Sequence, residues 1–447
     1  MKDVAIPEEI PARHMPRSRS TTLIFAGLFA VGLVAFLVLL AVDSHRAWQA
    51  YVANWLFVTS VAIGAIMVGA ATTIARARWN WSLRRISMAF GAFLPISFIL
   101  FLPMLTLGDN YFPWIEYMEF DEIVQKKEAY LNLPFLTARN VAGLLLLFGV
   151  ALYFVYLSVR PDLGEAPPPE EDDDGRRTWR ERLTGGWMGQ EKEALTAWTR
   201  MRAVAPALVL IYALVMSVIS VDWAMSLEPH WFSMLFPGWF FMGAFLAGLA
   251  VTGLTTMFLR RSPGSYLQEA VGPDQLHDLG KLTFGFSIFW MYLVFSQYIV
   301  IWYGKLPWEQ EWIIHRSMDG WGVFSVVTIA LCFFVPFAVL LGKRPKLNPQ
   351  ILGSVGGIIL LGLWLERYLL IAPSIREEGT PHMTLWEPAI ALLFIAPLVL
   401  SVRWFLSTFP MVQLWQPPPP EEAVEAEIPP EELERLRSER AAEQPQG

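Results

Sequence analysis

Three of the ionisable residues inside or at the end of long apolar stretches of the chain stand out. Asp222 ends one such stretch, and Glu366 and Arg367 are neighbours within another. A charged side chain near the centre of a bilayer costs several kcal/mol, so it usually faces the interior of a helix bundle or a water-filled cavity. These residues are therefore candidates for a site that carries protons or holds a polar ligand.

A carboxylate and an imidazole follow Asp222 closely, at Glu228 and His230. A desolvated carboxyl group and a histidine can both titrate near neutral pH and pass protons between water and a buried site. We therefore predict a proton relay of five residues. Its members are Asp222, Glu228, His230 and Glu366, with Arg367 setting the charge of the path. The alternatives are that Asp222 only ends its helix, that Arg367 only snorkels or pairs structurally, and that Glu228 and His230 are ordinary loop residues.

Further polar residues stand at a similar depth in other apolar stretches. They are candidates for contact with a quinone: Arg139, Gln297 and Tyr298. Because adjacent residues on a helix point about 100 degrees apart, we expect that Glu366 and Arg367 need not neutralise one another. Aromatic residues at the ends of the stretches are expected to anchor the membrane interface, and a minority of them to flank a quinone ring. They include Trp223, Trp231, Trp239, Trp302, Trp308 and Trp312.

The elements that must position these residues are membrane-spanning helices. Ten apolar stretches each supply roughly 20 residues, the length that lets a helix cross about 30 Å of hydrocarbon. We predict an all-α polytopic membrane protein with spans at Leu23 to Val42, Tyr51 to Ile74, Ile86 to Leu107, Leu136 to Val159, Ala203 to Asp222, Phe236 to Leu259, Leu279 to Trp302, Met318 to Leu341, Ile351 to Ile371 and Trp386 to Ser407.

Lys and Arg residues alternate between the loops. They are dense before the first span and after each even-numbered span, and sparse in the other loops. Because basic residues near span ends stay on the cytoplasmic side, both termini are predicted to be cytoplasmic. The five relay candidates then lie toward the outer face, which favours a half-channel or quinol pocket open to that side.

Composition narrows the chemistry. Charged residues make up 17% of the chain, and its net charge of -7 comes mostly from acidic, Pro-rich segments at Glu165 to Asp174 and Gln416 to Gly447, so it indicates no binding of nucleic acid. Cys332 is the single cysteine, and the six histidines all lie in predicted loops or tails. We therefore expect no metal site and no cofactor bound by this chain alone, so that any iron-sulfur cluster or haem c belongs to a partner.

The second and sixth spans are similar in sequence. One constant offset matches Trp55 with Trp239, Gly64 with Gly248 and Gly69 with Gly253, among others. The matched spans cross in the same direction, which predicts a parallel repeat of two four-helix bundles. The expected units begin with a cytoplasmic N-terminal segment (1–20), peripheral helix 1 (21–50) and a first bundle (51–235) that contains an acidic linker (160–200). A second bundle (236–372), peripheral helix 10 (373–410) and an acidic tail (411–447) follow.

Two runs of sequence resemble a known family. The run from Leu363 to Tyr368, which contains Trp, Glu and Arg, is similar to a helix of the NrfD/polysulfide-reductase family of membrane subunits. The run from Val221 to Ser233 resembles one branch of that family, the ActF-type subunit of bacterial alternative complex III. The resemblance extends over about residues 20 to 410 and leaves out the acidic tail.

The resemblance implies two four-helix bundles flanked by two peripheral helices, in the inner membrane of a bacterium. It implies a quinol:cytochrome c or quinol:oxygen-reductase complex with three kinds of partner: a multihaem c-type cytochrome, an iron-sulfur subunit and a sister NrfD-like subunit. In the sister, the Glu-Arg pair is followed by a pattern that includes a histidine, whereas this chain continues with Ser374, Ile375 and Arg376. That departure weakens quinol oxidation by this subunit itself and favours proton conduction or structural support.

Two other classes of function stay open. Ten helices with an internal repeat would suit a secondary transporter, although the repeat is parallel and no span has a strongly Gly/Pro-interrupted centre; Pro95 and Pro103 come nearest. A purely structural anchor for redox partners would also fit. Flux through the isolated protein would indicate transport, and co-purification with c-type haem would indicate a respiratory complex.

Overall fold

The computed structural model describes residues 6–7, 9–167, 173–262, 265–318, 320–376 and 382–417. Within these ranges the chain is helical, without strands, and ten helical segments are long and apolar enough to cross a membrane. The protein is therefore an all-α, multi-pass membrane protein, as the sequence predicts. Most of the acidic tail lies outside the described residues.

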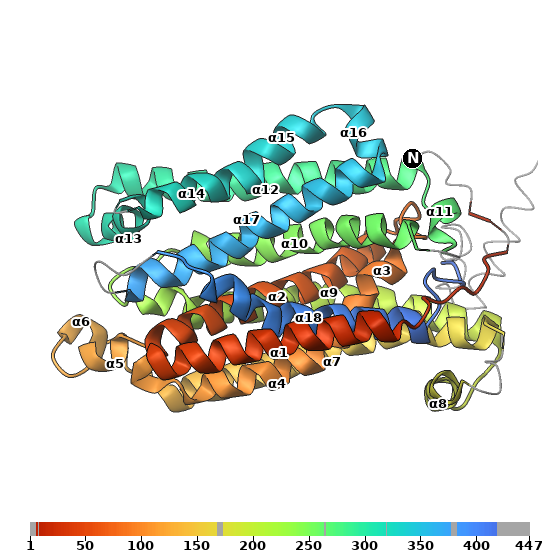
Figure 1. Ribbon diagram of the computed structural model, residues 1–447, viewed down its shortest axis with the longest axis horizontal. Helices are drawn as coiled ribbons and strands as arrows, with labels where there is room; N and C mark the ends of the chain where they lie inside the picture. Colours follow the sequence, from red (N-terminus) through yellow and green to blue (C-terminus); the bar gives the residue numbers. More distant parts are fainter. Residues whose placement is uncertain are drawn as a thin grey trace, which may run out of the picture.

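The ten spans run roughly along the long axis of the molecule (Figure 1). In chain order they are α1 (Arg19–Val42), α2 (Ser44–Ile74), a composite of α3 (Arg84–Ala89), η1 (Phe90–Phe93), α4 (Leu94–Phe101) and η2 (Leu102–Thr106), then α7 (Leu133–Glu165), α9 (Gln190–Trp223), α10 (Leu235–Arg260), α12 (Pro273–Gly304), a composite of α14 (Trp321–Ile329), η5 (Ala330–Phe334) and α15 (Val335–Leu340), then α17 (Pro349–Ile375) and α18 (Trp386–Thr408).

Short helices lie in the connections. One end of the bundle, at the left of Figure 1, holds α5 (Trp114–Tyr117), α6 (Glu122–Gln125) and α13 (Pro307–Ser317). We refer to it as the outer end, following the charge pattern of the loops. The opposite end holds α8 (Asp174–Leu183), α11 (Leu267–Ala270) and α16 (Lys343–Leu347). The first and last described segments meet there, because the Met15 N–H donates to the Leu406 carbonyl and the Met411 N–H to the Arg13 carbonyl.

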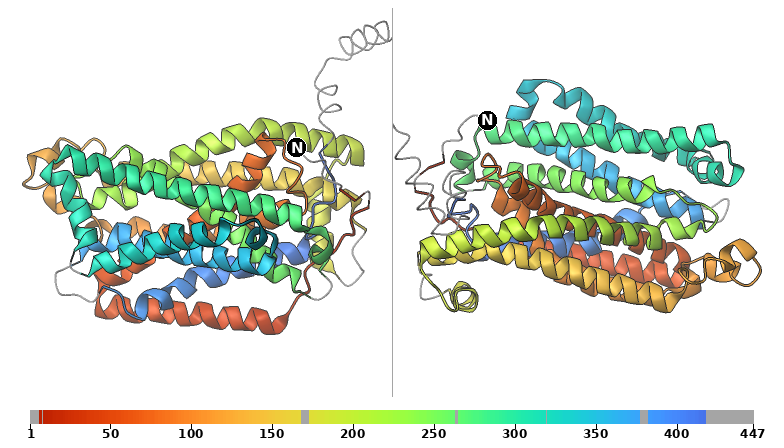
Figure 2. Two further views of the ribbon diagram at one scale, coloured as in Figure 1. Left: turned by 90° about the horizontal axis from the view of Figure 1, so that it is seen from above. Right: turned by 180° about the vertical axis from the view of Figure 1, so that it is seen from behind.

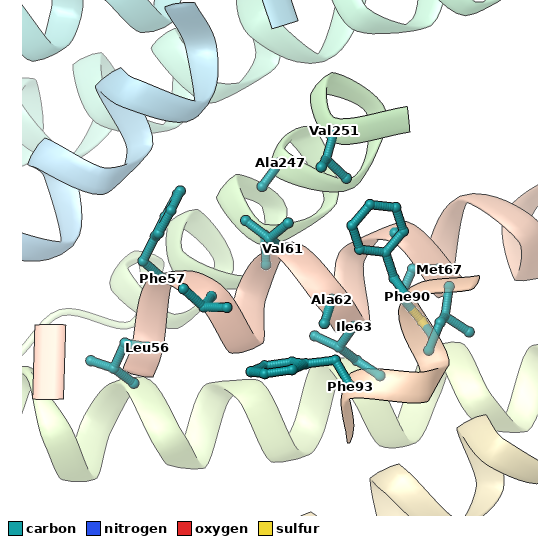
Figure 3. Packing of buried hydrophobic residues seen from close by; sticks show 14 of the residues in the cluster. Leu56, Phe57, Val61, Ala62, Ile63, Met67, Phe90, Phe93, Ala247 and Val251 are labelled. Atoms are coloured by element: carbon teal, nitrogen blue, oxygen red, sulfur yellow. The ribbon is translucent and has the colours of Figure 1, made fainter. Parts of the chain in front are cut away.

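Helix α2 is the centre of the molecule. In its most apolar stretch 89% of the residues are buried, against 22% in α1, which packs against α18 at the periphery. A helix that is apolar on all sides must be surrounded by protein or lipid, and α2 is enclosed by α9, α10, α17 and α18. Figure 3 shows part of this core, where Val61 of α2 faces Ala247 and Val251 of α10.

The glycines matched by the internal repeat make the closest contact in this core. A Cβ atom on Gly64 of α2 would collide with the backbone of Ala244 in α10, and one on Gly248 would collide with the backbone of Gly64. Small residues let helices approach closely where lipid supplies no hydrophobic drive. Gly64 and Gly248 thus allow α2 and α10 to approach closely, whereas Gly69 and Gly253 mainly face side chains of other residues.

Helices pack against each other within the two predicted bundles and also between them, because α2 packs against α10. Helix α9 packs against α2 and α7, and α10 packs against α12 and α17 (Figure 2). Two spans change their helix type midway: the third passes through the 3-10 turn η1, and the eighth through the π-helical turn η5. The Ser287 hydroxyl of α12 donates to the carbonyl of Cys332 within η5, at 2.6 Å. Such π turns concentrate at functional sites.

Candidate functional site

Asp222 lies in the last turn of helix α9, and its carboxylate is surrounded by polar side chains of α7 and of the loop before α7. Arg139 of α7 donates to both of its carboxylate oxygens, at 2.8 and 2.7 Å. Asn140 donates to it at 2.5 Å, and the Tyr130 hydroxyl at 3.0 Å. The Asp222 side chain is fully buried. Two-point arginine pairing with two further donors leaves this carboxylate little capacity for another partner.

The residues around Asp222 are bonded to each other as well. The indole of Trp223 donates to the Asn140 side-chain oxygen at 3.0 Å, and the Tyr111 hydroxyl donates to the Trp223 carbonyl at 2.8 Å. The Arg139 guanidinium stacks on the ring of Tyr130, 3.9 Å from its centroid. These contacts fasten the outer ends of α7 and α9 together. Arg139, a candidate for quinone contact, is thus engaged by Asp222.

Glu366 and Arg367 of α17 form an ion pair. Arg367 donates to Glu366 at 2.7 Å, and each side chain is 2% exposed. The expectation that the two charges need not neutralise one another is therefore wrong, because a long arginine side chain can bend back toward its neighbour. Arg367 also donates to the Phe240 carbonyl at 2.9 Å and stacks on the ring of Phe240, and the Trp290 indole donates to Glu366 at 2.7 Å.

A cavity of about 140 Å³ adjoins Glu366, and we refer to it as the inner cavity. Both polar atoms of the Gln297 side chain and the hydroxyl of Thr328 lie buried on its wall without a hydrogen-bond partner in the part of the chain that the structure describes. Buried polar groups almost always have partners, so these groups indicate bound water or a polar ligand. The volume holds several water molecules. The inner cavity is therefore a polar space next to a buried carboxylate.

Arg316 of α13 closes the outer side of the inner cavity. It donates to Glu228 at 2.9 Å, to Ser374 at 2.6 Å and to the carbonyls of Leu369 and Leu370 in α17. Desolvation lowers the pKa of the Arg316 guanidinium, while the carboxylate of Glu228 opposes that shift. Sequence analysis did not select Arg316, because an arginine in a loop beyond a predicted span looks like an ordinary surface cation.

A second cavity, of about 670 Å³, lies between the outer loops, and we refer to it as the outer pocket. Trp231 lines the outer pocket and Trp312 lines the inner cavity, and their rings stack with centroids 4.4 Å apart. The Arg316 guanidinium lies 3.9 Å from the Trp312 ring, on which it stacks. The two tryptophans therefore form a partition between the two cavities.

His230 lines the outer pocket and is hydrogen-bonded to Asp121, at 2.7 Å. This bond is the main cause of the lowered pKa of Asp121. Lys127 lines the same pocket and donates to the Pro229 carbonyl, and burial lowers the pKa of its ammonium group. The outer pocket is thus lined by groups that exchange protons with water.

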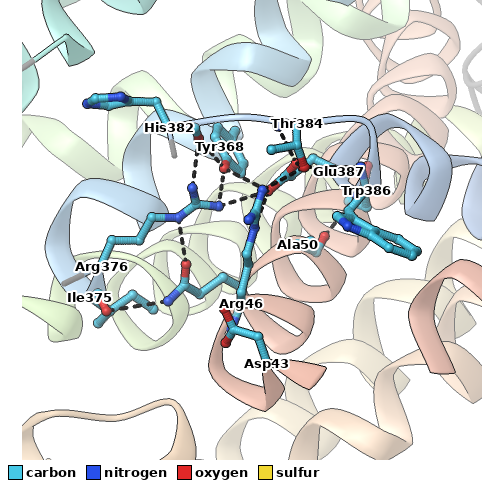
Figure 4. A network of polar contacts seen from close by, with 12 residues as sticks. Asp43, Arg46, Ala50, Tyr368, Ile375, Arg376, His382, Thr384, Trp386 and Glu387 are labelled. Carbon is cyan, nitrogen blue, oxygen red and sulfur yellow. Dashed lines mark hydrogen bonds and ion pairs between the residues drawn. The ribbon is translucent and has the colours of Figure 1, made fainter. Parts of the chain in front are cut away.

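Another polar network at the outer end joins α2, α17 and α18 (Figure 4). Glu387 of α18 accepts from Arg46 of α2 at 2.8 Å and from Arg376 at 3.0 Å, and Arg376 also bonds Tyr368 of α17. Glu387 is almost fully buried. Sequence analysis did not select Glu387, which stands at the predicted start of a span, where an acidic residue is common. The network holds the peripheral helix α18 to the bundle.

The structure separates the predicted site residues into two groups. Glu366, Arg367, Gln297 and Tyr298 lie at or beside the inner cavity, whereas Asp222 and Arg139 form the separate cluster at the end of α9. Glu228 and His230 belong to neither group. Glu228 bonds Arg316 beside the inner cavity, and His230 lines the outer pocket. The expectation of interface anchors is wrong for Trp223, Trp231, Trp239 and Trp312, which are at most 8% exposed, while Trp302 and Trp308 are 60% and 50% exposed.

The described residues contain no group of three or more His, Cys, Asp or Glu side chains arranged to hold a metal ion. No protein-family model matches the sequence, and no curated protein is significantly similar to it. The function of this chain is therefore inferred from its architecture and from the geometry of the two carboxylate sites.

Proposed function

We propose that this chain is an NrfD-like membrane subunit of a quinol-oxidising electron-transfer complex, and that it carries protons between the outer side and Glu366. The observation that carries the proposal is the inner cavity. There a buried carboxylate adjoins a space with unpartnered amide and hydroxyl groups. A water chain through this space would supply the proton contact that such a carboxylate needs.

The proposed path begins at the outer pocket, where His230, Asp121 and Lys127 meet water. It passes the Trp231 and Trp312 partition beside Arg316 and Glu228, and it ends at Gln297, Thr328 and Glu366. Glu366 receives and releases the proton, and Arg367 holds it when it is charged. Asp222 belongs to the proposal as a structural charge, because Arg139, Asn140 and Tyr130 already occupy its oxygens.

The redox chemistry is assigned to partners. The resemblance of Val221 to Ser233 and of Leu363 to Tyr368 supports assembly with a multihaem c-type cytochrome, an iron-sulfur subunit and a sister subunit, in a bacterial inner membrane with both termini in the cytoplasm. Electron transfer in a neighbour would change the proton affinity of Glu366. Contact with quinol is a second candidate role, favoured by the free amide of Gln297 beside the partly exposed Tyr298 in the wall of the inner cavity.

The test is the proton-to-electron stoichiometry of the purified complex in vesicles, with Glu366→Gln compared with the parent. We expect a lower stoichiometry with the haem and iron-sulfur content unchanged. The matched control is Glu311→Gln, an exposed carboxylate on the rim of the outer pocket, for which we expect no change. An intact complex with unchanged stoichiometry in Glu366→Gln would leave this chain as a structural anchor. Failure of the chain to co-purify with c-type haem would reject the respiratory assignment itself.

A further inference from the structure

A large cavity lies on the side of the bundle, away from both carboxylate sites. It has a volume of about 750 Å³ and follows α18 from Pro388 to Leu406, with α2, α10 and α17 as its other walls. We refer to it as the lateral cleft. At 1.5 Å per residue, the stretch of α18 that borders it is about 27 Å long, close to the thickness of the hydrocarbon layer.

The lining of the lateral cleft is apolar along its length and becomes charged only at one end. Val61, Val251, Leu360 and Val399 are typical of the walls. The single charged residue of the lining is Arg403, in the last turns of α18, near the end of the bundle where the first and last described segments meet. Ser262, just beyond α10, lines the same end.

Arg403 differs from the other arginines of the spans. Arg46, Arg139 and Arg367 each bond a carboxylate at 2.8 Å or less. For Arg403, by contrast, no ion pair or hydrogen bond occurs among the residues described, and its side chain is only half-buried. An arginine guanidinium at membrane depth is costly without an anion, and its planar fork fits phosphate oxygens in two-point bonding.

We propose that the lateral cleft binds a glycerophospholipid, with one acyl chain between α18 and the wall of α10 and α17 and the phosphate at Arg403. A phospholipid combines the long apolar body and the single anionic end that the cleft requires. The charge pattern of the loops assigns this end to the cytoplasmic side, where anionic lipids attract basic residues. This binding is independent of the proton path, because the cleft shares no lining residue with the inner cavity or the outer pocket.

Two competing occupants fit the cleft less well. The isoprenoid tail of a quinone would place a polar ring at one end, yet it carries no charge to satisfy Arg403. A transmembrane helix of a partner is about 10 Å wide with its side chains and needs a broad face rather than a cleft between helices. Neither a quinone nor an apolar helix supplies an anion for the guanidinium, so substitution of Arg403 should weaken a phospholipid more than either of them.

The experiment measures binding of phosphatidylglycerol to the full-length chain, purified and delipidated in detergent, by native mass spectrometry across a lipid titration. We expect the parent to hold one lipid, and Arg403→Gln to weaken its affinity about tenfold, as loss of charge-assisted hydrogen bonds predicts. Arg403→Lys should recover part of that affinity. Val399→Trp, which fills the cleft, should abolish the binding. The matched control is Arg344→Gln, an exposed arginine at the same end of the bundle, which should bind like the parent.

Three results would overturn the proposal. Loss of binding in Val399→Trp but not in Arg403→Gln would show that the lipid enters the cleft without its phosphate bonding to Arg403. Equal weakening in Arg344→Gln and Arg403→Gln would show a non-specific attraction to surface charge, and unaltered binding in every variant would place the lipid elsewhere. Each variant is first required to keep the parent's helicity and elution profile. If Val399→Trp fails this requirement, Leu361→Trp, at a half-exposed position on the opposite wall, takes its place.

Discussion

Asp222 in the fifth span and Glu366 in the ninth are both buried carboxylates, yet their surroundings differ. Asp222 is held by Arg139, Asn140 and Tyr130, and it lines neither the inner cavity nor the outer pocket. Glu366 has an arginine and an indole as partners and borders the inner cavity. A buried charge whose oxygens are all bonded fixes the structure, whereas one beside an incompletely bonded polar space can change its proton content.

The largest expected effect is on stability at Asp222. Asp222→Asn leaves the guanidinium of Arg139 buried without an anion, which costs about 3–5 kcal/mol in free energy of unfolding. Thermal unfolding of the purified chain in detergent, followed by circular dichroism, measures this loss. The double variant Asp222→Leu with Arg139→Met should recover most of the stability. An Asp222→Asn chain as stable as the parent would show that the ion pair does not fasten α7 to α9.

A second large effect is expected at the partition between the two cavities. Trp312→Ala removes the ring that stacks on both Trp231 and Arg316, and truncation of a buried tryptophan costs about 3 kcal/mol or more. It should also connect the outer pocket with the inner cavity and speed proton exchange. The measurement is passive proton leak through vesicles that contain the chain, with Trp308→Ala, an exposed tryptophan, as control. Equal leak in the two variants would contradict the partition.

A smaller stability effect is expected at Glu366. Glu366→Gln leaves Arg367 bonded to the Phe240 carbonyl and stacked on its ring, and the inner cavity has room for water that can bond the amide replacing the carboxylate. We expect a loss of about 1–3 kcal/mol, below that of Asp222→Asn. The same unfolding assay measures it. A loss as large as at Asp222 would mean that the two carboxylates are equivalent structural charges.

The smallest effect concerns the pair of Asp121 and His230 at the outer pocket. The hydrogen bond to His230 lowers the pKa of Asp121, so the folded protein favours the charged carboxylate. This contribution to stability is present above the unfolded pKa of about 3.8 and is lost as the pH falls through the folded value. The unfolding temperatures of the parent and of Asp121→Asn should therefore differ above about pH 3.8 and converge as the pH falls below it. A difference that widens on acidification would contradict this sign.

The spans and the glycine contact of the core are features that sequence can predict. Apolar length alone defines a membrane helix, and the match of Gly64 with Gly248 marks where α2 and α10 approach. The partners of the buried polar side chains cannot be predicted in this way. Arg139 and Asp222 stand 83 positions apart, and Trp290 and Glu366 stand 76 apart, so only the packing of the helices brings them together.

The sequence predicts Glu366, Gln297 and Tyr298 as site residues, but not the inner cavity that they line. Gln297 and Thr328 belong to different helices. They differ from other buried polar residues because their side chains have no hydrogen-bond partner among the described residues. Arg316 gains its role because α13 turns back over the end of α17. Such features depend on how loops pack over helix ends, which local residue patterns do not determine.

Access of water to the inner cavity is the measurement that tests the account most directly. Thr328→Cys, in a chain whose single native cysteine is replaced by Cys332→Ala, places a thiol on the wall of that cavity. With the partition opened by Trp312→Ala, a small, membrane-impermeant thiol reagent should modify it from the outer side of sealed vesicles, whereas Asn140→Cys beside Asp222, in the same background, should stay unmodified. Modification of the thiol at position 328 only from the opposite side, or equal protection of both thiols, would contradict a proton path from the outer side to Glu366.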